Sequence, residues 1–126
     1  MHAGVAAEPH ALETACDLLE AVGHATLSKL DGTVIVRMPC SAELGTAVIG
    51  RGSLSDIRIH DPWMHREHAH ITWDGAARAH MIADAGGANG TFVNLQRVAT
   101  AVPTRLTDGA RVRVGKTELI YRRVRS

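Results

Sequence analysis

The chain has 126 residues, of which 45% are hydrophobic, and its formal net charge is +1 at pH 7. This length suits a single domain, and the hydrophobic fraction is high enough to build a core, which excludes a wholly disordered chain. The near balance of charge gives no global attraction to nucleic acid or anionic lipid, so any anion site must come from local placement of charge. Neither a signal peptide nor an apolar run of about 20 residues is visible, so we expect a soluble, cytoplasmic protein without membrane insertion.

The first 23 residues predict a short helical extension ahead of the main domain, which we place at residues 24–126. Pro9 suits a first helical turn, and Gly23 is a natural C-terminal stop. Between them, apolar residues recur at three- and four-residue steps: Leu12, Ala15, Cys16, Leu19 and Val22. We expect this apolar stripe to pack on the following domain or on a second copy of the chain, which leaves a homodimer through the helix open.

From residue 24 onward, short apolar or alternating stretches are each closed by turn residues, which is typical of an antiparallel β-sandwich. Alternation places Ala69, Ile71 and Trp73 on the core side of one strand, and His68 and His70 on the other side. The sequence therefore predicts an all-β fold. The expected strands are residues 25–30, 33–38, 46–49, 57–59, 68–73, 78–83, 91–93, 97–98, 111–114 and 117–121.

Three expected loops carry residues that are unusual for simple connectors. They are residues 50–56, which begin with Gly50-Arg51, residues 65–69, which hold four charged or histidine side chains in a row, and residues 84–94. In the third loop, Asn89-Gly90 permits positive φ and hence a tight turn. Each feature alone is weak, because a lone Asn-Gly is usually a hairpin turn. Their order along the chain is the stronger observation.

In that order these residues resemble the forkhead-associated (FHA) domain family, whose pattern runs Gly-Arg, then Ser-x-x-His-Ala, then Asn-Gly-Thr-x-Val-Asn. The resemblance extends over residues 24–126. The matching positions are Gly50-Arg51, Asp56-Ile57, Ile59, Asp61-Pro62, His68-Ala69, Ile71, Asp84, Asn89-Gly90-Thr91-Phe92-Val93-Asn94, Leu106, Asp108-Gly109 and Val114-Gly115. The resemblance implies an FHA-type β-sandwich of about eleven strands with its binding loops at one end.

The resemblance also implies a function: a phosphothreonine-peptide-binding module that acts as a signalling adaptor downstream of a Ser/Thr kinase. Such a module binds a phosphothreonine-containing protein or peptide, does not bind nucleic acid, is not an enzyme, and needs no cofactor or metal. A phosphothreonine carries about −1.5 to −2 charges and three acceptor oxygens. A planar guanidinium suits such a group, because it can donate to two oxygens at once.

By the resemblance, individual positions take separate roles. Arg51 is expected to bind the phosphate, and Asn89 to bind the peptide backbone beside it. His68 is expected to hydrogen-bond within the loops and hold their shape, while Gly50 and Gly90 serve backbone geometry. The loop top around Ala88 is expected to contact residues that flank the phosphothreonine. For Arg51 the alternative is a surface ion pair with Asp56, and for Asn89 it is a plain turn residue.

The chain departs from the family pattern in the second and third loops. The family's phosphate-binding serine is His65 here, and the usual Ser-Thr before Asn-Gly is Gly87-Ala88. Losing one charge-assisted hydrogen bond costs about 1.5–3 kcal/mol, or roughly ten- to a hundredfold in affinity. Arg66 is expected to offer a second guanidinium. His65 is expected to donate from its imidazole, more strongly when protonated, so that binding would strengthen as pH falls toward 6. A usual turn glycine is also replaced, by Leu95.

Two other classes of protein remain as alternatives. The first is a degenerate FHA domain that serves phosphate-independent protein interaction or oligomerisation, which the missing hydroxyls favour. The second is a metal-binding protein, because imidazole is a common zinc ligand and several histidines lie near one another in sequence: His60, His65, His68, His70 and His80. The two cysteines, Cys16 and Cys40, lack CxxC spacing, so we expect reduced thiols, with a disulfide as the alternative.

Overall fold

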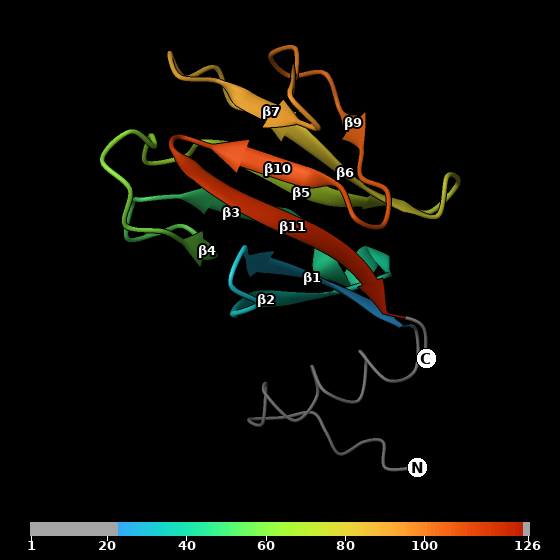
Figure 1. Cartoon of the computed structure of the whole chain (residues 1–126). Coiled ribbons are helices and arrows are strands. Elements are labelled where there is room, and N and C mark those ends of the chain that lie inside the picture. The colour runs from blue at the N-terminus through green and yellow to red at the C-terminus, as the bar shows by residue number, and fades with distance from the viewer. Residues whose placement is uncertain (1–22, 125–126) are drawn as a thin grey trace.

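A computed structural model describes residues 23–124 of the chain, which form a sandwich of two β-sheets (Figure 1). The predicted N-terminal helix, and any dimer contact that it would make, lies outside the described residues. The strands are β1 (His24–Lys29), β2 (Val34–Pro39), β3 (Ala47–Gly50), β4 (Ile57–Arg58), β5 (Ala69–Asp74), β6 (Ala79–Asp84), β7 (Thr91–Val93), β8 (Gln96–Arg97), β9 (Thr104–Arg105), β10 (Arg111–Val114) and β11 (Thr117–Val124).

The eleven strands confirm the predicted all-β sandwich. The six-stranded sheet has the order β2-β1-β11-β10-β7-β8, and the five-stranded sheet has the order β4-β3-β5-β6-β9. Most neighbours are antiparallel, while β3 and β4 run parallel. Two short elements were missed: β9 and a 3₁₀ turn, Ala42–Leu44. Both are two or three residues long with no buried hydrophobic residue, so they carry no periodic signal.

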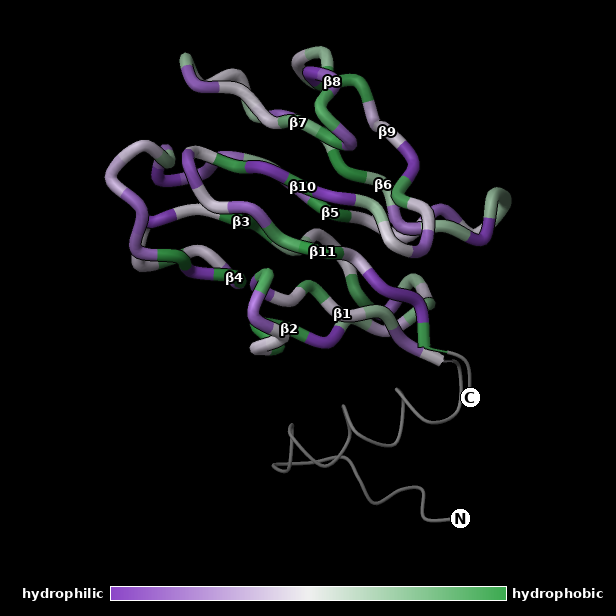
Figure 2. The backbone as a smooth tube through the Cα atoms, in the orientation of Figure 1, coloured by the Kyte–Doolittle hydropathy of each residue, from purple (hydrophilic) through white to green (hydrophobic). Residues whose placement is uncertain are grey.

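The core lies between the sheets and is made almost entirely of aliphatic side chains, as the scarcity of aromatic residues requires. Alternating residues of the long strands are buried, and Figure 2 shows hydrophobic and hydrophilic residues that alternate along β10 and β11. Members with no exposed surface include Ala25, Leu27, Ile49, Ala69, Ile71, Ile82, Val112, Val114, Leu119 and Tyr121.

The alternation predicted for β5 is confirmed for its first core positions. Ala69 and Ile71 are fully buried, whereas Trp73 is only half-buried near the strand's end. The prediction for His68 was wrong, because this residue is fully buried although the alternation places it on the outer side. His68 precedes β5, so its side chain follows the geometry of the loop and not that of the strand.

The core also contains a buried polar pair, which lies at the end of β5 and β6 that is away from His68. The His80 Nδ1 atom lies 2.6 Å from the Tyr121 hydroxyl, and its Nε2 lies 3.0 Å from the Pro39 carbonyl oxygen. A carbonyl can only accept, so Nε2 carries the proton and Nδ1 accepts from the tyrosine. Burial lowers the pKa of His80, and the hydrogen bond to Pro39 opposes this only in part.

The fold gathers the three unusual loops at one end of the sandwich, on the left of Figure 1. These are the β3–β4, β4–β5 and β6–β7 loops. The β5–β6 turn and both ends of the described chain lie at the opposite end. Within the described residues, no helix has the length and apolarity needed to cross a membrane.

The lowered pKa of His80 predicts how stability depends on pH. An unfolded histidine takes up a proton near pH 6.5, whereas the folded protein holds His80 neutral to lower pH. The neutral His80 therefore contributes to the free energy of unfolding above pH 6.5. This contribution is lost as pH falls toward the folded pKa, by up to about 1.4 kcal/mol per pH unit. In urea unfolding, the free energy of unfolding should fall less between pH 7.5 and 5.5 for His80→Gln than for the unmodified protein. Equal falls in the two proteins would contradict a lowered pKa of His80.

Candidate functional site

The first two loops are joined by backbone hydrogen bonds along their length. Arg51 N donates to the His65 carbonyl at 3.0 Å, and Gly52 N donates to the Arg66 carbonyl at 3.2 Å. The Ser55 hydroxyl donates to the same Arg66 carbonyl at 2.9 Å. The β3–β4 loop therefore lies against the β4–β5 loop, and the side chains of both reach the same surface.

Gly50 is required by this close approach. A Cβ atom at residue 50 would lie 1.9 Å from the Arg66 carbonyl oxygen and 2.8 Å from the Ser55 hydroxyl. Because the first of these contacts is with backbone, no rotamer change can relieve it. The structure thus explains the glycine before Arg51 by packing of the two loops, consistent with the backbone role that the resemblance implies.

The Arg51 side chain is held by its inner nitrogen and is otherwise free. Its Nε donates to the Met64 carbonyl at 2.7 Å. Within the described residues the two Nη nitrogens have no hydrogen-bond partner, and no ion pair with Asp56 forms. The Asp56 carboxylate instead accepts from Val48 N at 2.9 Å. This arrangement fixes the direction of the guanidinium while leaving its donor edge for a ligand.

A hollow of about 420 Å³ lies beside Arg51, and three guanidinium groups line it. Arg66 is one of them, as expected. The third, Arg58 on β4, was missed by sequence reasoning, although the apolar residues on either side of it place it on the outer face of the strand. Arg58 Nε donates to the Arg51 carbonyl at 3.2 Å. The lining residues are Arg51, Gly52, Ser53, Leu54, Ser55, Arg58, Arg66 and Glu67.

His68 joins the second loop to the third. Its buried ring accepts from His65 N through Nδ1 at 3.1 Å, and its Nε2 lies 2.7 Å from the Gly90 carbonyl oxygen. An amide N–H can only donate and a carbonyl can only accept, so the ring is neutral with its proton on Nε2. Both ring nitrogens are thereby satisfied within the protein.

Asn89 makes a further link between these loops. Its Nδ2 donates to the Trp63 carbonyl at 2.6 Å, which leaves the side-chain oxygen as an acceptor on the exposed surface. Gly90 follows with φ +71°, and a Cβ there would lie 2.7 Å from Arg97 Nε. Asn89 is therefore more than a turn residue, since it ties the third loop to the second.

His65 occupies space that a side chain at residue 87 would need. A Cβ at Gly87 would lie 2.1 Å from His65 Cδ2. The His65 ring also accepts a hydrogen bond from Ala88 N through Nε2, at 3.0 Å. The His65 imidazole thus fills the gap between the loops that the absence of a side chain at Gly87 leaves.

The hydrogen bond from Ala88 N occupies the Nε2 lone pair of His65. A protonated Nε2 has no lone pair, so it cannot accept from Ala88 N. The neutral ring keeps Nδ1 as its one N–H donor. The donation to a ligand that is expected of His65 would therefore come from Nδ1.

Two buried carboxylates hold the bases of the loops. Asp61 accepts from Trp63 N at 2.8 Å, from Lys116 N at 2.8 Å and from the Thr117 hydroxyl at 2.7 Å. Burial raises the pKa of Asp61, but the hydrogen bonds from Thr117, Trp63 and Lys116 outweigh it and the net shift is downward. The second carboxylate, Asp84, accepts hydrogen bonds from the Thr91 hydroxyl at 2.7 Å and from Gly86 N at 2.9 Å.

The histidines do not come together as a metal site. Across residues 23–124, no three His, Cys, Asp or Glu side chains lie close enough to hold a metal ion. His68 has both nitrogens in use, and His80 is buried beside Tyr121 at the other end of the sandwich. Cys40 is a free thiol at that same end, and Cys16 lies outside the described residues.

The contact between His65 and residue 87 predicts a coupled effect on stability. Gly87→Ala should lower the free energy of unfolding by about 1–3 kcal/mol, because the His65 ring must move. In a His65→Ser background the same change should cost less than half as much. Chemical denaturation of the four proteins gives the coupling energy. Equal costs in both backgrounds would show that the ring does not fill this space.

Comparisons with known proteins agree with this geometry. The FHA domain profile matches residues 47–115, which is more than half of the chain. The chain is 37% identical over 78 residues to the FHA domain-containing protein FhaA of Mycobacterium tuberculosis, covering 62% of this chain and 14% of FhaA. It is 36% identical over 76 residues to the glycogen accumulation regulator GarA of Mycolicibacterium smegmatis, covering 60% of this chain and 45% of GarA. It thus spans less than half of these curated relatives.

A solved FHA domain, studied for phosphothreonine-dependent interactions, shares the fold. Its sequence is 33% identical, and the superposition covers 79% of this chain and 95% of that domain with a TM-score of 0.64. The residues of the three loops, with Gly50, Gly87 and Gly90, lie within the span that the profile matches. The chain therefore belongs to the FHA domain family.

Proposed function

We propose that this protein is a phosphothreonine-peptide-binding module that acts as a cytoplasmic signalling adaptor. It would bind a protein phosphorylated by a Ser/Thr kinase and carry out no reaction itself. The observation that carries the proposal is the hollow beside Arg51, which three arginines line, together with Asn89, which is bonded to the same β4–β5 loop that contributes Arg66. The solved FHA relative with phosphothreonine-dependent interactions supports the same ligand.

Charge and geometry at Arg51 fit a phosphate dianion. The bond from Nε to the Met64 carbonyl directs the guanidinium, and both Nη nitrogens remain as donors. Because the group is already oriented, less side-chain entropy is lost when a ligand binds. A phosphate offers acceptor oxygens for a fork of two N–H groups, the geometry in which arginine binds most strongly.

Arg58 and Arg66 offset the hydroxyls that this chain lacks. His65, Gly87 and Ala88 stand where the family has hydroxyl side chains, and each missing bond to a charged group is worth about 1.5–3 kcal/mol. Two further guanidiniums line the same hollow and supply charge in place of hydroxyl donors. Glu67 also lines it and reduces the net positive charge. We therefore propose that electrostatic attraction contributes more to binding here than hydroxyl contacts do.

Asn89 and Ala88 would contact the rest of the peptide. The Asn89 side-chain oxygen is exposed, so it can accept from a backbone N–H of the ligand while Nδ2 stays on the Trp63 carbonyl. Ala88 is exposed on the same loop top and presents only a methyl group. Residues that flank the phosphothreonine would meet this small surface.

The proposal predicts phosphate-dependent binding that requires Arg51. Calorimetry would compare phosphorylated and unphosphorylated forms of the same threonine peptides, taken from a degenerate library. Arg51→Gln should weaken phosphopeptide binding by about tenfold to a hundredfold. Arg37→Gln, which makes the same charge change at an exposed position of β2, is the matched control and should leave affinity within about twofold.

A degenerate domain with phosphate-independent partners is the second candidate, and the missing hydroxyls favour it. Equal affinity for the two peptide forms, or the same loss from Arg37→Gln as from Arg51→Gln, would contradict the phosphothreonine proposal and favour this alternative. Arg58→Gln and Arg66→Gln separate the contributions of the other two guanidiniums.

A further inference from the structure

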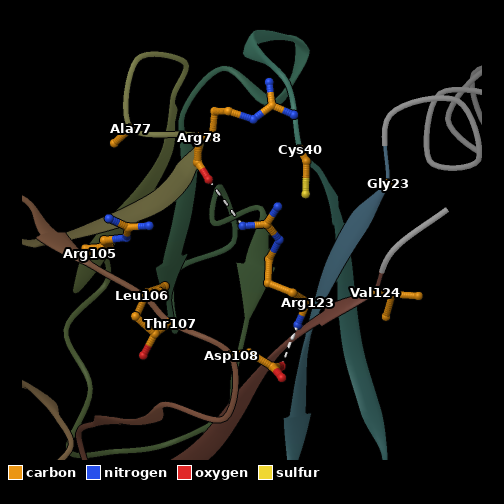
Figure 3. Close-up of a pocket in the computed structure, with 10 residues that line it drawn as sticks. All are labelled: Gly23, Cys40, Ala77, Arg78, Arg105, Leu106, Thr107, Asp108, Arg123 and Val124. Atoms are coloured by element: carbon orange, nitrogen blue, oxygen red, sulfur yellow. Dashed lines mark hydrogen bonds between the residues drawn. The ribbon is translucent and has the colours of Figure 1, made fainter.

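A second and larger hollow lies at the end of the sandwich opposite the three loops. Its volume is about 610 Å³, and Figure 3 shows the side chains that surround it. It forms where the end of β2, the β5–β6 turn, the β9–β10 turn and the end of β11 meet. The lining residues are Gly23, Cys40, Ala77, Arg78, Arg105, Leu106, Thr107, Asp108, Arg123 and Val124.

Three arginines give this hollow a positive charge that the described residues do not neutralise. Within residues 23–124, neither Arg78 nor Arg105 nor Arg123 forms an ion pair with a carboxylate. Asp108 is the one acidic lining residue, and its Oδ1 accepts from the backbone N of Arg123 at 2.9 Å. Like charges held together repel one another, so an anion in the hollow would stabilise it.

Contacts with neighbouring residues direct the Arg123 guanidinium. Arg123 Nη1 donates to the Arg78 carbonyl at 3.3 Å, and its guanidinium lies 5.3 Å from the centre of the Trp73 ring. In Figure 3 the Arg123 side chain extends between Arg78 and Asp108. The Cys40 sulfur lies on one side of it and Arg105 on the other. These contacts fix Arg123 and leave its remaining N–H groups for a ligand.

The chain itself contains a segment of complementary charge that starts at the rim of this hollow. Residues 1–22 contain four carboxylates and no Lys or Arg, whereas residues 23–126 contain all 14 Lys and Arg. Gly23 lines the hollow and is joined directly to this segment. Glu20 and Asp17 are three and six residues from Gly23, so they lie about 5 Å and 9 Å along the predicted helix from it, and at most about 10 Å and 20 Å away in an extended chain. Both carboxylates can therefore reach the arginines.

We propose that the hollow is the docking site for the acidic N-terminal segment of the same chain, with Asp17 and Glu20 bound to Arg78, Arg105 and Arg123. Docking neutralises the arginine cluster and keeps the segment at the end of the sandwich away from the peptide-binding loops. The proposal is independent of phosphothreonine binding, because it uses no residue of those loops.

Cys40 provides the readout, because its thiol lies inside the hollow. In a Cys16→Ser background Cys40 is the only thiol, and its rate of alkylation by iodoacetamide, an uncharged reagent, reports whether the hollow is covered. Asp17→Asn/Glu20→Gln in the full chain should raise this rate by about tenfold. Arg105→Gln should raise it as well, and adding it to the acidic changes should give no further increase.

A matched control removes two carboxylates elsewhere on the surface. Glu43→Gln/Glu67→Gln makes the same charge change, and Glu43 is three residues from Cys40, so this pair also reports the electrostatic effect on the thiol itself. The control should change the alkylation rate by less than about twofold. Equal rates in the acidic variant and the unmodified chain would overturn the proposal. Protection that rises with protein concentration would overturn it too, because it would assign the hollow to another copy.

Discussion

The His68 imidazole lies buried between the β4–β5 and β6–β7 loops, where it accepts from His65 N and donates to the Gly90 carbonyl. Both hydrogen bonds lie at the end of the sandwich that holds the three loops, and the ring has no exposed surface. A buried polar group without a hydrogen-bond partner costs about 1–3 kcal/mol, so moving the loops apart would cost free energy of this order. The positions of Arg51 and Asn89 depend on this link, because Arg51 is bonded to the second loop and Asn89 joins the third loop to it.

The hydrogen-bonded loops leave room for the large His65 side chain between them. His65 replaces a small hydroxyl residue, yet its ring fits because Gly87 has no side chain and because Nε2 accepts from Ala88 N. The His65 ring thereby connects the β4–β5 loop to the β6–β7 loop. Under the proposed function, ligand attraction would come from Arg51, Arg58 and Arg66, which line one hollow.

The sequence predicted the β-sandwich because turn residues close nearly every strand and because the motif residues occur in family order. It also named Arg51, His68 and Asn89, which are signalled by residue type and spacing. It missed Arg58, since a charged residue in a two-residue strand looks like ordinary surface until the fold brings it beside Arg51. It did not predict that the His65 ring fills the space beside Gly87, since this fit joins residues that are 22 positions apart in sequence. Contacts of this kind leave no periodic pattern.

Native-state hydrogen exchange of a His68→Ala variant tests the role of this link most directly. We predict that the amides of Arg51, His65 and Gly90 lose much more protection than the amides of β5, β10 and β11, which should change only by the drop in global stability. Such a result would show that the imidazole holds the loops on a sandwich that folds without it. Equal loss of protection at every amide, or unchanged protection in the loops, would contradict the account.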